Sequence, residues 1–578
     1  MSKQALVSFE CSASFNPNSN PFTATLNLGL HELSWTFRDA DNSTCRIPYS
    51  CIFGYQVPSE AALVTEQDVE ELIRTAVEGK QVIIHYLEFT VPDLNSAPRL
   101  AQARLLFHQR SDVKQFLVRA KELEVFPKQR RILFLVNPKG GVGRAKTISD
   151  TIVKPMLEHS GLEVTEQYTE YARHAVDIAH KLDLNTFDAL VVISGDGVMH
   201  EIINGLLSRP DWDLARRLPV GVISAGSGNA IATSLGTRNQ YVAALAAIRG
   251  ETAKMDIFSM SQLDRPRIYS MLLFSWGMTA DADLESDRYR WLGPLRFEIA
   301  AFVRMIRLRR YPGKVYVLPP KDDDTSMLPP TPPCSPDHAA PGIRHGSLLR
   351  NPDQEPPKSW RLLDLPYYTF FLLLNHPSLT EDVYFTNEIR FNDGIMRLWY
   401  SCETTFWKIL MPFVMDQQNG KLVERGLMTG IKCGGILIVP GVEGNPDDPS
   451  THAIVDQSVT STAAKKQEIY TKPGFFDVDG EAMPTTRTLI EILPSFVEII
   501  VPEWYNHPDD KEENSVRGKA RADLILEVTA NRQVETNKVL EVGKWLGVMV
   551  LTVTAYAVYF SEGFQIWSGI ARSAAQIL

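Results

Sequence analysis

The sequence predicts three successive domains: a small β domain, a doubly wound α/β domain, and a β-rich, sandwich-like domain. Short alternating runs fill the first 125 residues, and strand-like and helix-like runs then alternate from Arg130 to about Lys254. After Met255 the apolar runs are mostly strand-like. A chain of 578 residues is also too long for a single hydrophobic core. Together these observations predict an α/β plus β fold.

The overall composition indicates an intracellular globular protein. Hydrophobic residues make up 44% of the chain and charged residues 22%, which is ordinary for a packed fold. A formal net charge of -10 argues against bulk binding of nucleic acid, which requires a basic surface. The six cysteines form no Cys-x-x-Cys pair, so neither a disulfide framework nor a structural zinc site is indicated. Because the start of the chain lacks the apolar core of a secretory signal, we expect a cytoplasmic protein.

Residues 1–125 predict a small β domain closed by a helix. Alternating runs predict strands at Thr23–Leu28, Glu32–Phe37, Val82–Leu87 and Ala103–Phe107. The apolar residues of Ser111–Leu123 share one face of a helix. Strands closed by a final helix resemble a β-barrel of the pleckstrin-homology kind. The resemblance is one of architecture, because this region carries no chemical motif.

Residues 126–265 predict the α/β domain. Its apolar runs predict parallel strands at Ile132–Val136, Leu162–Tyr168, Leu190–Ile193 and Val220–Ser224. The helix after the first strand carries Ile148, Ile152, Val153 and Met156, and the next carries Val176, Ala179 and Leu182. In such folds ligands bind beyond the carboxyl ends of the strands, where all the glycine turns of this domain fall.

Three of these glycine turns predict a polyphosphate site. They are Asn137–Arg144, Ser194–Gly197 and Gly226–Asn229, and each directly follows a predicted strand. Glycine lets the backbone approach a bulky anion, and the start of a helix favours negative charge. The first turn fits neither a Walker loop nor a dinucleotide fingerprint. Asp196 is an acid where phosphate should bind, which indicates either proton or metal handling or simply a helix N-cap.

Residues 266–505 predict the β-rich domain, and residues 506–578 a C-terminal tail. Strand-like runs fall at Ile268–Trp276, Tyr367–Leu374, Met396–Tyr400, Gly435–Val439 and Ile490–Leu493. Two insertions, 318–358 and 443–472, are predicted to be disordered, the first because it is crowded with proline and acidic residues. The tail contains an uncharged segment, 545–561, at the short limit of a membrane span. This segment is equally consistent with spanning the bilayer, lying on it, or docking on the core.

Five sequence blocks resemble those of the lipid kinases of the diacylglycerol-kinase type. The first three are Asn137-Pro138-Lys139-Gly140-Gly141, Ser194-Gly195-Asp196-Gly197 with Glu201, and Gly226-Ser227-Gly228-Asn229. The stretch from Ala280-Asp281-Ala282-Asp283 to Arg296-Phe297, and the block Phe476-Asp477-Val478-Asp479-Gly480-Glu481, are similar to those of the sphingosine (long-chain-base) kinases. The resemblance covers about Arg130 to Glu503.

The resemblance implies an ATP-dependent kinase of sphingolipid metabolism with ATP and Mg²⁺ as cofactors. Its substrate would be a sphingoid base (sphingosine, sphinganine or phytosphingosine), phosphorylated at the primary hydroxyl to give the 1-phosphate. Asp479 would also reach magnesium through Mg-ATP. The nucleotide contacts that the resemblance implies are Asn137, Pro138, Lys139, Thr169, Glu170, Arg173, Ser194, Gly195, Gly197, Glu201, Gly226, Ser227, Gly228, Arg290, Arg296, Asp479, Gly480 and Glu481.

The resemblance also implies roles at the lipid. Asp196 would be the general base that takes the proton of the primary hydroxyl. Asp283 would select the lipid by pairing with its amine or accepting a hydrogen bond from its 3-hydroxyl. Ser194 and Phe297 would contact the substrate. Trp291 stands where many members of the family carry a basic residue, which lowers the positive charge there.

Several alternatives remain open at this stage. The same chemistry could act on diacylglycerol or ceramide, and the Gly-Asp-Gly turn is shared with soluble NAD kinases. A catalytically inactive lipid-binding scaffold could use the same fold. Glu201 could be an ordinary acid on a helix face, and Asp281, His200 and His376 are expected to be structural. We expect peripheral contact with intracellular or plasma membranes and no nucleic-acid partner.

Overall fold

The computed structural model describes most of the three predicted domains. The described residues are 7–14, 22–28, 32–37, 44–56, 81–88, 98–140, 143–286, 295–319, 352–379, 385–409, 428–441 and 474–502, with gaps at 108, 227–228, 307, 364, 387–388, 404 and 406–407. They form two compact units, each described here by itself. Unit 1 holds the described residues up to Met255 and those from Ser495 onward, and unit 2 holds those from Asp256 to Pro494.

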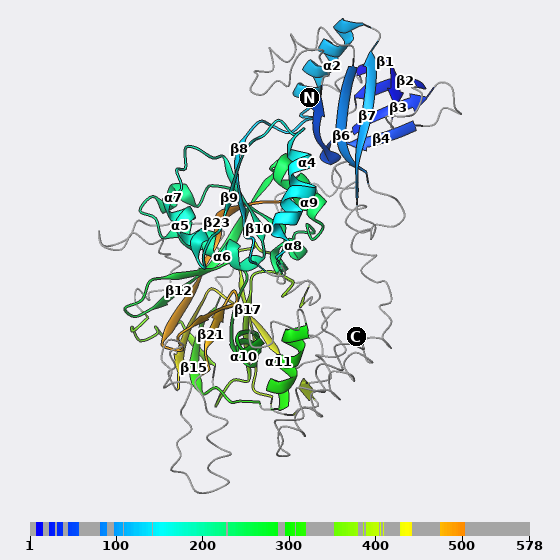
Figure 1. Ribbon diagram of the computed structural model, residues 1–578. Helices are drawn as coiled ribbons and strands as arrows, with labels where there is room; N and C mark the ends of the chain where they lie inside the picture. Colours follow the sequence, from blue (N-terminus) through cyan, green and yellow to red (C-terminus); the bar gives the residue numbers. More distant parts are fainter. Residues whose placement is uncertain are drawn as a thin grey trace, which may run out of the picture. The chain divides into compact units, whose positions relative to one another are not determined.

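Unit 1 begins with a seven-stranded antiparallel sheet closed by helix α2 (Figure 1). The strands lie in the order β4-β3-β2-β1-β7-β6-β5, and Leu26, Leu105 and Phe116 of α2 are fully buried in their common core. The predicted strands and closing helix are present. The bounds are β1 Val7–Ser14, β2 Phe22–Leu28, β3 Glu32–Phe37, β4 Thr44–Pro48, β5 Ile52–Gln56, β6 Gln81–Glu88, β7 Arg99–Phe107 and α2 Arg110–Glu122.

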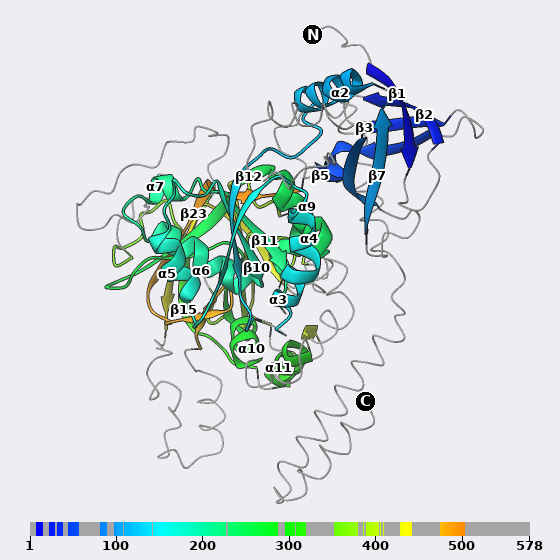
Figure 2. The same cartoon turned by 45° about the horizontal axis from the view of Figure 1, so that its top comes forward.

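The α/β part of unit 1 is a parallel sheet covered by helices on both faces. Strands β11, β10, β8 and β9 lie side by side in that order, with α5 and α6 on one face and α4 and α9 on the other (Figures 1 and 2). The strands are β8 Arg131–Val136, β9 Glu163–Tyr168, β10 Ala189–Ser194 and β11 Val220–Ser224. The helices are α3 Ala145–Ile148, α4 Lys154–Leu157, α5 His174–Lys181, α6 Asp196–Leu207, α7 Trp212–Ala215, α8 Ala230–Ser234 and α9 Gln240–Arg249. The predicted doubly wound sheet is therefore confirmed.

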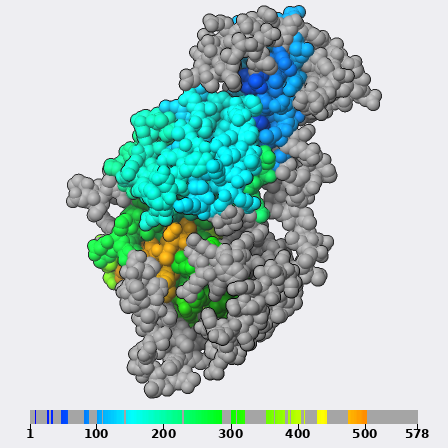
Figure 3. Space-filling model, viewed as in Figure 1, coloured from blue at the N-terminus to red at the C-terminus, as the bar shows by residue number. Residues whose placement is uncertain are grey.

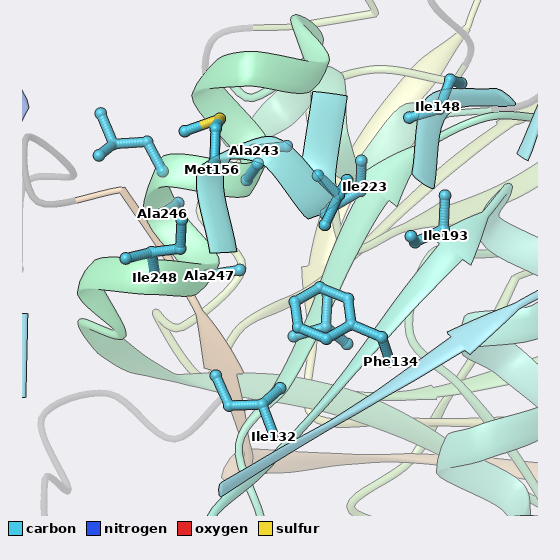
Figure 4. Close-up of a cluster of buried hydrophobic side chains, with 14 of the residues drawn as sticks. Ile132, Phe134, Ile148, Met156, Ile193, Ile223, Ala243, Ala246, Ala247 and Ile248 are labelled. Carbon is cyan, nitrogen blue, oxygen red and sulfur yellow. The ribbon is translucent and has the colours of Figure 1, made fainter. Parts of the chain in front are cut away.

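Strand side chains and small helix residues form the core of this sheet. Phe134 and Ile193 lie in one buried cluster with Ala243 and Ala247 of α9. Phe134 points toward Ala247, and the small side chains of α9 let the helix lie close to the strands (Figure 4). The helix predicted after β8 is interrupted by a π-helical stretch, Ser149–Val153. Pro155 follows it and has no N–H to donate to the preceding turn, which accounts for the widened coil. Figure 3 shows the α/β part as a continuous cyan surface.

A fifth strand reaches the α/β sheet from the far end of the chain. β23 (Thr488–Ile500) pairs antiparallel with β20 at its start, and Ile499 near its end pairs parallel with Val220 of β11. Pro494 and Ser495, whose φ is +49°, separate these two parts of the strand. In unit 1 Phe496 stacks on Trp212 with ring centroids 5.9 Å apart. The strand expected at Ile490–Leu493 is thus longer than predicted.

Unit 2 consists of two sheets that share one core. One has the order β16-β15-β20-β23, with β12 pairing with β13 and β23, and the other has the order β19-β18-β17-β14-β21-β22. Phe258 and Ile436 of the first and Phe274 and Leu373 of the second lie in the same buried cluster. The bounds are β12 Thr252–Gln262, β13 Ile268–Ser270, β14 Leu273–Gly277, β15 Gly313–Leu318, β16 Arg361–Leu363, β17 Phe370–Leu374, β18 Met396–Ser401, β19 Thr429–Cys433, β20 Gly435–Pro440, β21 Phe476–Val478 and β22 Glu481–Met483, with helices α10 Met278–Ser286 and α11 Leu295–Ile306.

Parts of the predicted insertions and tail lie outside the described residues. These parts are 320–351, 443–472 and the tail from 503, including the apolar segment 545–561. The end of the first insertion is described from Pro352, and Arg487 donates hydrogen bonds to the carbonyls of Pro352 and Gln354. Within the described ranges no helix is long and apolar enough to cross a membrane.

Candidate active site

Hydrogen bonds join three strand ends of the parallel sheet in unit 1. Asn137 follows β8 directly, and its Nδ2 donates to the Ser194 hydroxyl at the end of β10, 3.4 Å away. The Thr169 hydroxyl, just beyond β9, donates to Oδ1 of Asn137 at 3.2 Å. The amide of Lys139 donates to the same oxygen at 3.2 Å, which fixes the turn after β8. Asn137, Thr169 and Ser194 therefore lie together, as their positions after neighbouring strands predict.

Asp196 links two of the glycine turns. It is the first residue of α6, and its side chain is 7% exposed. Its Oδ2 accepts a hydrogen bond from the amide of Ala230 at 2.7 Å, and its Oδ1 accepts one from Ile231 at 3.3 Å. These amides begin α8, so the carboxylate satisfies donors that a helix start leaves unpaired. Gly195 and Gly197 flank Asp196 in the same turn.

The third glycine turn is held beside the other two. The amide of Ala225 donates to the carbonyl of Ser194 at 3.0 Å, and Nδ2 of Asn229 donates to the carbonyl of Gly226 at 2.8 Å. Ser227 and Gly228 lie outside the described residues. The turns after β8, β10 and β11 therefore meet at one edge of the sheet, where backbone amides and a helix start can face an anion.

Three further residues of the predicted nucleotide site surround the start of α5. Oε2 of Glu201 accepts a hydrogen bond from the amide of Ala175 at 3.2 Å, so this acid binds the first turn of α5. Arg173, with φ of +64°, is the N-cap residue of the same helix. Glu170 is exposed, and its amide donates to Nδ1 of His174 at 3.0 Å. The contact of Glu201 with Ala175 is a structural role that sequence reasoning did not foresee.

In unit 2, α10 carries Asp283 next to a carboxyl group that sequence reasoning missed. Asp477 on β21 is buried, and it accepts hydrogen bonds from the Ser275 hydroxyl and the Gly480 amide, each at 2.9 Å. Burial raises the pKa of Asp477 well above its usual range, and the negative charges of Asp283 and Asp479 raise it further. Asp283 is half-buried, so it is the more accessible of the Asp283–Asp477 pair. The alternation of acidic and apolar residues in the block Phe476–Glu481 was the sequence signal that could have identified Asp477.

The Asp479 carboxylate accepts hydrogen bonds from four donors of one short stretch. Its Oδ1 accepts from the Ser270 hydroxyl at 2.7 Å and from the amides of Leu272 and Leu273 at 3.0 and 2.8 Å. Its Oδ2 accepts from the amide of Met271 at 3.0 Å. These contacts explain why the predicted strand Ile268–Trp276 is divided into β13 and β14. Magnesium favours carboxylate oxygens with room for octahedral coordination, and Oδ1 of Asp479 is already surrounded by three donors.

For the other predicted site residues of unit 2, the structure gives the position and exposure but does not by itself indicate a role. Gly480, with φ of +93°, forms the tight turn between β21 and β22, and Glu481 begins β22 exposed. Arg296 is half-buried on α11, whereas Arg290 and the side chain of Phe297 lie outside the described residues. The described ranges contain no group of three or more His, Cys, Asp or Glu side chains placed to hold a metal ion.

Asp281 lies at the centre of a buried ion-pair cluster. Its Oδ2 is 2.6 Å from Nη1 of Arg309 and 3.7 Å from Nε of Arg304, and it accepts a hydrogen bond from the Tyr311 hydroxyl at 2.6 Å. Arg304 also pairs with Glu285. Burial raises the pKa of Asp281, although the two guanidinium groups oppose this shift. Asp281 is therefore structural, as expected, because it fastens α10 to the segment after α11.

Replacing Tyr311 by phenylalanine is expected to destabilise unit 2 without touching the charges of this cluster. The loss of one hydrogen bond to a buried carboxylate costs about 1.5–3 kcal/mol. Thermal unfolding of the full chain measures this loss as a lower Tm. The control is Tyr316→Phe on β15, whose hydroxyl makes no hydrogen bond within the part of the chain that the structure describes. Equal Tm values for the two variants would contradict the assigned role of Tyr311.

Known proteins resemble the chain in both units. A family model described as the diacylglycerol kinase catalytic domain matches residues 131–260. Sphingosine kinase 1 of Arabidopsis thaliana is 30% identical over 401 residues, which cover 67% of this chain and 81% of that protein. Sphingosine kinase 1 of Homo sapiens is 30% identical over 386 residues, which cover 64% of this chain and 91% of that protein. A crystal structure of a diacylglycerol kinase from Bacillus anthracis str. Sterne aligns with 97% of its chain and 64% of this one, at 16% identity and a TM-score of 0.42.

Proposed function

Since this chain belongs to the sphingosine kinase family, we propose that it transfers the γ-phosphate of ATP to the primary hydroxyl of a sphingoid base. The product would be the sphingoid 1-phosphate. One structural observation carries the proposal: Asp196 lies where the turns after β8, β10 and β11 meet. A kinase of this type needs an anion site and a proton acceptor side by side, and this edge of the sheet supplies both.

Membership of a kinase family implies the use of ATP, and we place its phosphates at the glycine turns of unit 1. The helix start at Gly195–Gly197 and the turns Asn137–Lys139 and Gly226–Gly228 would bind the phosphates through backbone amides. Lys139 would add positive charge. Magnesium neutralises phosphate charge in phosphoryl transfer. Since donors of the chain surround Oδ1 of Asp479, we assign the steps of the transfer to residues of the chain.

A substitution at Gly140 tests this placement of the nucleotide. A Cβ atom at Gly140 would lie 2.7 Å from Nδ2 of Asn137 and 3.2 Å from the Ser194 hydroxyl. Gly140→Ala must therefore displace the side chains that join β8 to β10, and we expect kcat/KM for ATP to fall about 10- to 100-fold. The control is Gly434→Ala, whose Cβ would meet its nearest atoms at 3.8 and 3.9 Å. A nucleotide site elsewhere would leave both variants equally active with ATP.

We assign the role of general base to Asp196. As the lipid hydroxyl oxygen attacks the γ-phosphorus, the bond from this phosphorus to the bridging oxygen would break and release ADP, and the carboxylate would take the hydroxyl proton. The amides of Ala230 and Ile231 hold the carboxylate in one orientation. A weak base suffices when the bond to phosphorus forms and the attacking hydroxyl becomes acidic.

We assign selection of the lipid to Asp283. A sphingoid base carries a cationic amine beside its hydroxyl groups, whereas diacylglycerol and ceramide carry no cation. The half-buried Asp283 carboxylate supplies the negative charge that would favour a cation in this part of unit 2. Ser194 and Phe297 remain proposed substrate contacts, and Arg290 and Arg296 remain proposed phosphate contacts.

We further propose that the chain works at a membrane surface, because its long-chain substrate partitions into bilayers. The apolar segment 545–561 would make peripheral contact with intracellular or plasma membranes from the cytoplasm. The first sheet would be a pleckstrin-homology-like domain. In support of this, its seven antiparallel strands are closed by a C-terminal helix.

Transfer of labelled phosphate from ATP to a panel of lipids tests the proposal. The full chain is incubated with labelled ATP, magnesium and either sphinganine, ceramide or diacylglycerol in mixed micelles. We expect product with sphinganine and little with the two neutral lipids. Preferential labelling of diacylglycerol or ceramide would change the substrate class. No transfer to any of the three would indicate an inactive lipid-binding scaffold.

A further inference from the structure

We infer that Asp479 is a positioning residue for the lipid-selecting part of unit 2 and not a ligand of magnesium; this inference rests on the proposed function. Four donors to its carboxylate come from one short stretch, Ser270–Leu273. The amide of Asp479 in turn donates to the carbonyl of Leu273 at 3.1 Å. Hydrogen bonds in both directions thus join the turn after β21 to the turn before β14: the Asp479 carboxylate accepts them, and the Asp479 amide donates one.

The bonds to Asp479 replace those that an uninterrupted strand would make. Between β13 and β14 the amides of Met271 and Leu272 point to the carboxylate, which is itself 7% exposed. Buried amides without partners are costly, so this carboxylate is required for the turn to keep its shape. A magnesium ion on Oδ1 would have to displace these donors, because it needs a carboxylate oxygen at about 2.1 Å. Oδ1 is already satisfied by the chain's own donors.

The same block also holds β14 further along its length. Asp477, two residues earlier, accepts a hydrogen bond from the hydroxyl of Ser275 in the middle of β14, and another from the amide of Gly480. β14 then runs directly into α10, which carries Asp283. The block from Asp477 to Gly480 therefore fixes both the start and the middle of the strand that leads to Asp283. A change at Asp479 should be transmitted to Asp283.

The full-length Asp479→Asn variant separates the two roles. An asparagine presents an N–H₂ group to amide donors, so the turn Ser270–Leu273 loses part of its anchor. We expect kcat/KM for sphinganine to fall about 10-fold, mainly through a higher KM for the lipid. The KM for ATP and the magnesium concentration for half-maximal activity should stay at the wild-type values. A higher magnesium requirement with an unchanged KM for sphinganine would overturn the inference.

Ser270→Ala gives a second test of the positioning role, because this substitution does not change a candidate magnesium ligand. It removes one donor to Asp479 and leaves the carboxylate intact, so we expect a smaller rise in the KM for sphinganine, about 3-fold. The matched control is Ser259→Ala, a fully buried serine of β12 in the same unit whose hydroxyl has no partner among the described residues. Equal lipid KM values for the two serine variants would contradict the inference. Since each variant is compared with active wild-type chain, failure of the proposed function would appear separately, as inactive wild type.

Discussion

Replacing Asp196 by asparagine is expected to lower kcat for sphinganine by about 10²- to 10⁴-fold. The asparagine side chain has nearly the same shape, but it cannot take the proton of the attacking hydroxyl. The KM for ATP should change little, because the backbone amides that we assign to the phosphates are retained. Single-turnover phosphate transfer measures the loss directly, since it excludes effects on product release.

The control for Asp196→Asn must account for the contact with α8. Because Asp196 binds the amides of Ala230 and Ile231, the asparagine variant also weakens the start of that helix, by about 1 kcal/mol. Thr233→Ala removes a hydroxyl that donates to the carbonyl of Asn229 in the same helix, and it leaves the carboxylate in place. We expect near-wild-type kcat from Thr233→Ala. Similar activities of the two variants would show that Asp196 acts only through the helix.

Replacing Asp283 by asparagine is expected to reduce kcat/KM for sphinganine by about 10- to 100-fold. The variant loses the negative charge that we pair with the amine, while its size is unchanged. The activity on diacylglycerol, however low, should not fall, because that lipid has no cation to lose. The ratio of the two activities therefore measures selectivity independently of how much enzyme is correctly folded.

Asp264→Asn is the matched control for this selectivity experiment. Asp264 is an exposed aspartate of the same unit with φ of +55°, a conformation that asparagine adopts readily. The control changes the net charge by the same amount and should leave selectivity as in the wild type. If Asp283→Asn kept the wild-type ratio, Asp283 would not be the lipid selector.

The edge of the sheet in unit 1 could be predicted because its signals are local. Each strand is an apolar run ended by glycine or a small polar residue, and parallel neighbours bring their carboxyl ends together. Asn137 and Ser194 are far apart in sequence, yet they follow paired strands and therefore meet. Alternating apolar runs, which are also local signals, predicted most strands of the seven-stranded sheet to within a few residues.

Long-range partners could not be predicted in this way. The pairing of Val220 with Ile499 joins segments with no shared pattern, and nothing in the run Ile490–Leu493 indicates that the strand continues past Pro494. Three of the bonds to Asp479 are formed by backbone amides, which no residue type reveals. Family resemblance draws attention to Asp479 as a nucleotide residue, whereas its contacts place it in the support of β14. The sequence thus singled out Asp479, but it did not reveal the hydrogen-bond donors that surround the carboxylate.

A crystal structure of the full chain with a non-hydrolysable ATP analogue and sphinganine is the most direct test of the central claim. We predict that the phosphates contact the backbone amides of the turns after β8, β10 and β11, and that the primary hydroxyl lies within hydrogen-bond reach of Asp196. Phosphates bound away from the Ser194–Gly197 turn, or a hydroxyl out of reach of Asp196, would contradict it.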